Sequence, residues 1–245
     1  DEHLLDVEPE RDLATDVDVA IQQADLAAAL EDMAGQQAEA EHSVAAIADW
    51  QPSGAAGATR PSLPAAISLE ALTADLVLGR THLVMLAAHR LSDDCEAVAD
   101  ELIAEALARG LSVAVVDAGS ANLSEAPGLS DLSSGKASFG DVVHKSSDNS
   151  FAEVPWGRGR AILRSSSRPL TLVEALGDIY EVVVLLTGRV GMNSTLPMFA
   201  GLDGRVVLVA GQDDDGDAVA DSRAQLLEAG FDTVEIAQGP TRVAA

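Results

Sequence analysis

Residues 87–110, AAHRLSDDCEAVADELIAEALARG, have the outline of a strand, a loop and a helix that stops at a glycine. In many enzymes this outline holds a nucleotide phosphate, with glycine and lysine in the loop. Here the loop carries Asp93 and Asp94, and Cys95 follows them. Carboxylates are favoured at the positive end of a helix dipole, so we interpret both aspartates as caps of a helix over 95–109 rather than as cation ligands.

Cys95 is the only cysteine, so the chain can form no internal disulfide, and a reducing cytosol is the simplest interpretation. A position near a helix start lowers the pKa of a thiol, whereas neighbouring acids raise it. We expect a buried, inert thiol.

Other polar residues are weaker candidates for chemistry. Asp117 ends an apolar strand and is either a ligand contact or a turn acid. The stretch GQDDDGD (211–217) lacks the spacing and the closing glutamate of a calcium loop, so we interpret it as a solvated turn. His89 and Arg90 fit a surface loop better than a phosphate site. No Ser-His-Asp or Cys-His arrangement stands out, and the histidines show no metal-ligand spacing.

One basic cluster stands out in this acidic chain. RSSSR (164–168) lies close to Arg158 and Arg160. Two interpretations stay open: a docking site for an acidic partner or for a neighbour's acidic arm, or an ordinary solvated loop.

The composition excludes several classes of partner. The 245 residues are 47% hydrophobic and 3% aromatic, with a net charge of -25 and a pI of about 4.2. Such a surface repels nucleic acid and anionic lipid, so we expect neither DNA binding nor direct docking on membrane headgroups. No apolar run approaches the ~20 residues of a membrane helix, and no signal peptide is visible.

The chain divides into three predicted parts. Residues 1–50 hold fourteen acidic residues and one basic residue, and form either a helical arm with a narrow apolar stripe or a disordered one. Residues 51–67 are rich in Pro, Gly, Ala and Ser, which is typical of a linker. Residues 68–245 carry the pattern of a folded domain.

Within that domain, helical and strand patterns alternate. We predict helices over 69–79, 95–110, 171–179, 194–202 and 217–230, and strands over 82–88, 112–118, 151–155, 180–186, 205–210 and 233–237. Strands that are apolar on both faces predict an α/β fold with a parallel sheet flanked by helices. Ligands of such sheets bind at the carboxyl ends of strands, so the loops after Ala88, Asp117 and Leu186 are the candidate site.

Four segments resemble the cytoplasmic domain of bacterial tyrosine kinases, which accompany polysaccharide co-polymerases and have the P-loop-NTPase fold of the MinD/ParA type. They are PGLSDLSSGKASFGDVVHK (127–145), FAEVPWGR (151–158), YEVVVLLTGRVG (180–191) and GRVVLVA (204–210). The resemblance runs from about residue 68 to 237.

The resemblance implies a phosphate loop of the form G-x-G-K-[ST] after the first strand. Its glycines fall on Leu91 and Asp93, its lysine on Asp94 and its Mg²⁺-binding hydroxyl on Cys95. A carboxylate therefore replaces the cation, and side chains occupy positions where the backbone must approach phosphate.

Two further motifs of the family are altered. Of its Asp-x-Asp motif, Asp117 is kept, but the second position is Gly119. The acid that ends the later strand is Leu186 here, followed by Thr187, Gly188 and Arg189. These positions are not expected to bind a nucleotide well, so we predict a degenerate site with no ATP or Mg²⁺ cofactor, no metal and no catalytic residue.

The resemblance then implies a non-catalytic role through protein contacts in exopolysaccharide or capsule biosynthesis, in polymerisation, chain length or export. The expected partner is a membrane polysaccharide co-polymerase or the protein's own membrane portion, at the cytoplasmic side of the inner membrane, and homo-oligomers are left open. Tyr180, the only tyrosine, rules out a phosphorylated tyrosine cluster in this segment. The alternatives are an active ATPase or tyrosine kinase with an atypical site, and a positioning or pilus-assembly protein of the MinD/ParA type.

Overall fold

The structure is a computed structural model and describes residues 66–239. The predicted arm (1–50) and nearly all of the predicted linker (51–67) lie outside the described residues. Residues 66–239 form one seven-stranded sheet in the order β3-β4-β2-β5-β1-β6-β7. Its strands are β1 (Leu83–Ala88), β2 (Val113–Asp117), β3 (His144–Lys145), β4 (Phe151–Val154), β5 (Val182–Arg189), β6 (Arg205–Ala210) and β7 (Val234–Gln238).

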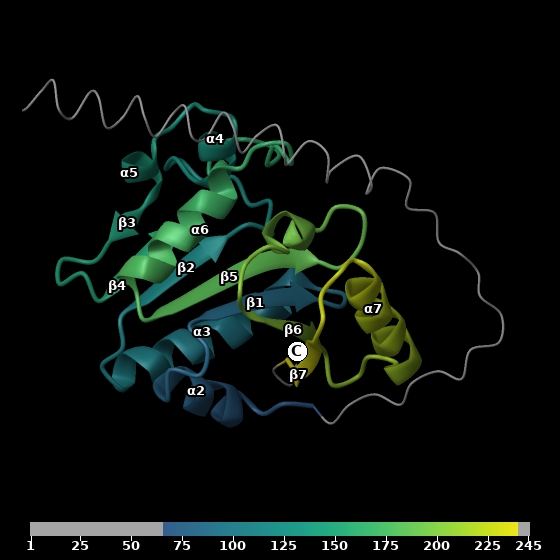
Figure 1. Ribbon diagram of the computed structural model, residues 1–245. Coiled ribbons are helices and arrows are strands. Elements are labelled where there is room, and N and C mark those ends of the chain that lie inside the picture. Colours follow the sequence, from purple (N-terminus) through teal and green to yellow (C-terminus); the bar gives the residue numbers. More distant parts are fainter. Residues whose placement is uncertain (1–65, 240–245) are drawn as a thin grey trace, which may run out of the picture. The chain divides into compact units, whose positions relative to one another are not determined.

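Every neighbouring pair in the sheet is parallel except β3 and β4, which are antiparallel. The helices that connect the strands cover both faces (Figure 1). They are α2 (Leu69–Val77), α3 (Ser92–Ala108), α4 (Leu129–Ser133), α5 (Phe139–Val142), α6 (Arg168–Ile179), the 3-10 helix η1 (Leu196–Phe199) and α7 (Gly216–Glu228).

The apolar strands explain this layered arrangement. All six residues of β1 are buried, and successive side chains point to opposite faces of the sheet. Val84 and Leu86 pack with α2 and α3, whereas Leu83 and Met85 pack with α4, α6, η1 and α7. The sheet is therefore buried on both faces, as a parallel sheet requires.

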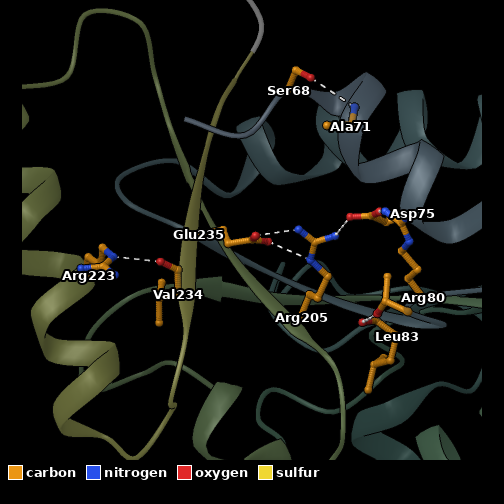
Figure 2. A network of polar contacts seen from close by, with 10 residues as sticks. Ser68, Ala71, Asp75, Arg80, Leu83, Arg205, Arg223, Val234 and Glu235 are labelled. Carbon is orange, nitrogen blue, oxygen red and sulfur yellow. Dashed lines mark hydrogen bonds and ion pairs between the residues drawn. The ribbon is translucent and has the colours of Figure 1, made fainter. Parts of the chain in front are cut away.

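Charged residues fasten α2 to the edge of the sheet (Figure 2). The Arg205 guanidinium on β6 contacts the Glu235 carboxylate on β7 at 2.6 Å and the Asp75 carboxylate on α2 at 2.6 Å. Arg80 also contacts Asp75, at 3.0 Å. Hydrogen bonds from Arg205 and then Arg80 hold the pKa of Asp75 below its usual value. Ser68 caps α2 by accepting from the Ala71 N–H at 3.1 Å.

Several predicted boundaries differ from the structure. The second helix begins at Ser92 rather than at Cys95, because the polar residues before Cys95 already have helical backbone. The predicted helix over 194–202 is only the short 3-10 turn η1, which contains Pro197. Tyr180 is the C-cap of α6 rather than the start of a strand.

The segment 127–145 holds α4, α5 and β3, none of which the hydrophobic pattern predicts, because each is five residues or shorter. Across residues 66–239, no helix combines the length and the apolar character needed to cross a membrane.

Candidate functional site

The connection between β1 and α3 is short. β1 ends at Ala88 and α3 begins at Ser92, which leaves His89, Arg90 and Leu91 between them. The His89 N–H donates to the Val209 carbonyl at 2.8 Å, so the first of the three residues still belongs to the sheet edge. A phosphate-binding loop uses the N–H groups of a longer, glycine-rich turn to surround a phosphate. This connection is too short to form that cradle.

The two aspartates lie in the first turn of α3. The N-cap residue is Leu91, which makes no side-chain cap hydrogen bond, so neither aspartate occupies the cap position that was predicted. Their position still favours negative charge, because the helix dipole is positive at this end. The Asp94 side chain is buried and lies against Gly239 beyond β7: a Cβ on that glycine would come within 3.3 Å of the Asp94 Cβ.

The thiol of Cys95 is buried on the inner side of α3. The residue is 1% exposed, and burial, followed by the carboxylates of Asp94 and Glu96, raises its pKa far above the usual value. A protonated, buried thiol is a poor nucleophile and a poor metal ligand. The predicted inert thiol agrees with this geometry.

The Asp117 carboxylate at the end of β2 is held by its own turn. One oxygen accepts from the backbone N–H groups of Gly119 at 3.0 Å and Ser120 at 2.8 Å, and the other accepts from the Ser120 hydroxyl. Of the two interpretations, the structure favours a turn acid, because local donors take up its lone pairs.

The loops after β2 and β5 close the carboxyl edge of the sheet. A Cβ on Gly119 would overlap the backbone of Gly188, and a Cβ on Gly188 would lie 2.7 Å from the Gly119 carbonyl oxygen. Next to this contact, the Ala118 N–H donates to the Leu186 carbonyl at 2.8 Å. Gly188 has φ +74°, a conformation that glycine adopts without strain.

A small cavity lies between the start of α3 and the ends of β2 and β5. The cavity bounded by Cys95, Asp117, Gly119, Leu186 and Gly188 has a volume of about 10 Å³, room for about one water molecule. Pockets for small molecules and cofactors measure roughly 300–1,000 Å³. This cavity lies far below that range.

The chemistry of the lining residues also does not suit Mg²⁺ with a nucleotide. Leu186 is partly buried among the apolar residues of α3 and the sheet, and supplies no side-chain oxygen for a hard cation. The adjacent Thr187 hydroxyl donates to the Leu86 carbonyl at 2.9 Å inside the sheet. No cluster of three or more His, Cys, Asp or Glu residues suited to a metal is found between residues 66 and 239.

The structure corrects the interpretation of His89. It is buried rather than on a surface loop, and its Nδ1 lies 2.9 Å from the Ser222 hydroxyl of α7. Arg90 is exposed and contacts Asp214 at 3.5 Å. Asp214 itself accepts from the Gly211 N–H at 2.7 Å, so the 211–217 stretch contains a turn, as predicted. The only sequence signal for the burial of His89 is the apolar run over residues 82–88 that directly precedes it.

The basic cluster lies on a loop that reaches the end of β5. Arg164 donates to the Met192 carbonyl, and Arg158 donates to the Glu125 carbonyl at 2.7 Å. Both use backbone carbonyls rather than carboxylates. The loop therefore presents positive charge that no side-chain acid neutralises in the described part of the chain.

Comparisons with known proteins give structural likenesses only. No protein-family model matches the chain, and no curated protein matches it. The kinase domain of the Escherichia coli tyrosine kinase ETK is 20% identical with a TM-score of 0.57, over 73% of this chain and 76% of that one. The chimerical protein CapA2B2 is 15% identical with a TM-score of 0.57, over 71% and 84%. The VpsO kinase domain is 19% identical with a TM-score of 0.52, over 71% and 92%.

These likenesses show the fold. The chain has the α/β architecture of bacterial tyrosine kinase domains, with a mostly parallel sheet flanked by helices, so the predicted fold class of the P-loop-NTPase type is confirmed. At such low identity, they carry no information about activity.

Proposed function

We propose that this protein is a tyrosine-kinase-like domain without nucleotide chemistry, which acts through protein contacts in exopolysaccharide or capsule assembly. The observation that carries the proposal is the closed edge of the sheet, where Gly119 meets Gly188 and the remaining cavity measures about 10 Å³. The choice of cellular process follows the sequence resemblance to tyrosine kinase domains that accompany polysaccharide co-polymerases, and the shared fold with the kinase domains of ETK and VpsO is consistent with it.

The charges at this edge oppose phosphoryl transfer. That reaction depends on positioning and on neutralisation of phosphate charge by lysine and Mg²⁺. Asp94 and Asp117 bring negative charge instead. Two like charges 4 Å apart repel by about 4 kcal/mol at an effective dielectric constant of 20, whereas a lysine would attract by a similar amount.

The only tyrosine of the chain also fits a non-catalytic role. Tyr180 is 3% exposed at the end of α6, and burial raises the pKa of its hydroxyl. A tyrosine side chain with so little exposure does not reach the active site of a neighbouring kinase without local unfolding. Phosphorylation of this segment on tyrosine is therefore not part of the proposal.

The basic cluster is the surface we assign to partner contacts. The sequence contains four arginines and no acidic residue between Glu153 and Glu174, although the net charge of the whole chain is -25. Leu163 and Met192 are 49% and 78% exposed and lie beside these arginines, because Arg164 bonds to the Met192 carbonyl. We call Arg158, Arg160, Leu163, Arg164 and Met192 the arginine surface.

Positive charge with exposed apolar side chains suits an acidic protein segment that carries apolar residues. A nucleic acid or an anionic membrane would meet the repulsion of the whole chain. We assign the segment to a membrane polysaccharide co-polymerase, or to a membrane portion of the same protein. This contact would hold the domain at the cytoplasmic side of the inner membrane.

The proposal is tested in cells that make the polysaccharide. Arg160→Glu with Arg164→Glu is expected to change the length distribution or the amount of polymer, while Arg109→Glu, an exposed change on α3, leaves both unchanged. Thermal unfolding of each purified variant shows that the fold is kept. An unaltered polymer in the double variant would contradict a role for this surface.

A further inference from the structure

A second, larger cavity lies at the same end of the sheet, on the other side of β1. It has a volume of about 440 Å³ and is lined by the ends of β1 and β5 and by one side of α7. This volume falls within the range of small-molecule sites. We infer that it binds a small hydroxylated molecule that carries an oxyanion, such as a sugar phosphate or a sugar acid.

A buried polar pair lines the wall of this cavity. His89 and Ser222 are each 9% exposed, and the His89 Nδ1 lies 2.9 Å from the Ser222 hydroxyl. Among the described residues, no buried side-chain nitrogen or oxygen lacks a hydrogen-bond partner. Nδ1 is used by Ser222. Nε2 has no hydrogen-bond partner among the described residues, so it meets solvent and is available to a ligand in the cavity that His89 lines.

Two guanidinium groups stand at the rim. Arg189 on β5 lies in register with Ala88 on the adjacent strand β1, and Ala88 directly precedes His89. Arg189 also lines the cavity and forms no ion pair with any described residue. Arg90 lines the same cavity and is 66% exposed, with one contact to Asp214 at 3.5 Å. Guanidinium groups bind carboxylate and phosphate oxygens in pairs, so they select an oxyanion.

The α7 wall, which also carries Ser222, selects hydroxyl groups. Asp215 offers acceptor oxygens and Gln225 offers both donors and acceptors. Val190 and Ala218 are the apolar members of the lining, and no Phe, Tyr or Trp is among the lining residues. A compact polyol with one anionic group matches this wall better than a nucleotide does.

The test is calorimetry on the whole chain with four probes: glucose 1-phosphate, glucuronate, glucose and inorganic phosphate. Glucose 1-phosphate or glucuronate, or both, should bind measurably at millimolar concentration or better, and at least tenfold more tightly than glucose. Comparison of the two oxyanion probes shows which group the arginines hold. Equal affinity for inorganic phosphate and the sugar phosphate would mean an adventitious ion only and would overturn the inference.

Variants locate the binding. Arg189→Gln should lower the affinity for the probe at least tenfold, because it removes a group that contacts the ligand directly. Ser222→Ala should lower the affinity about threefold or more, because Ser222 acts on the ligand through His89. Arg109→Gln, at the exposed C-cap of α3, is the matched control and should have no effect. Binding that survives Arg189→Gln unchanged, or no binding of either sugar oxyanion at 10 mM, would overturn the inference. Neither result depends on whether ATP binds, so the proposed function is judged separately.

Discussion

The backbones of Gly119 and Gly188 meet at the carboxyl edge of the sheet, so closely that neither position has room for a Cβ. Gly119 follows β2 and Gly188 lies near the end of β5, two of the three strands whose ends were predicted to form the candidate site. The loops after β2 and β5 are therefore packed against each other and close this edge of the sheet.

Gly119→Ala should therefore destabilise the protein. The added methyl group must push the β2 and β5 loops apart, and overpacking of this kind costs about 1–3 kcal/mol of unfolding free energy. Urea unfolding measures the loss. Gly201→Ala is the matched control, since a Cβ there meets nothing within 4 Å. Equal stability of the two variants would show that the loops are not packed together.

Asp117→Ala is expected to act on stability and on nothing else. It leaves the Gly119 and Ser120 N–H groups without their acceptor, which costs about 1–3 kcal/mol. Asp117→Asn, which keeps one acceptor oxygen, should lose less. Thermal unfolding distinguishes the two variants. If instead Asp117→Ala left stability intact and removed a ligand-dependent signal, Asp117 would be a ligand residue.

Cys95 should resist thiol reagents in the folded protein. Its sulfur is buried and its pKa is raised, so the thiolate is scarce at neutral pH. Labelling with a disulfide reagent should proceed only as fast as the protein opens, and should be complete within seconds in denaturant. Fast labelling of the native protein would contradict the burial of this helix face.

Arg205→Met should lower the unfolding free energy by about 1 kcal/mol at pH 7, since it breaks a network that joins α2, β6 and β7. Asp75 has a lowered pKa in the folded state, so its contribution is present above its unfolded pKa, near pH 4, and is lost as the pH falls below that.

The difference between wild type and Arg205→Met should consequently shrink from pH 5 toward pH 2 in urea unfolding. Arg109→Met, which breaks an exposed pair with Glu105 on α3, is the control and should change stability much less. A constant difference across this pH range would contradict the role of Asp75.

The sequence was sufficient for the fold because its strands are continuous apolar runs. β6 occupies the predicted residues 205–210, and β1 and β2 differ from their predicted ends by one residue. The short elements between residues 127 and 145 could not be predicted, because a turn of helix buries too few residues to produce a periodic pattern.

The candidate site was only partly predictable. The family resemblance places Asp94 where a lysine is expected and Leu186 where an acid is expected, a comparison of residue types that needs only the sequence. The contact between Gly119 and Gly188 joins residues far apart in the chain, and the His89–Ser222 pair spans β1 and α7. Such contacts depend on strand order and register, which no local pattern specifies.

The measurement that tests the central claim most directly is calorimetry of the whole chain with ATP and ADP in the presence of Mg²⁺. The ETK kinase domain, which shares the fold, serves as the comparison protein under the same conditions. We predict no binding heat for this protein at millimolar nucleotide, because the edge of its sheet is closed and acidic. Micromolar binding would contradict the account and would require the loops at Gly119 and Gly188 to open.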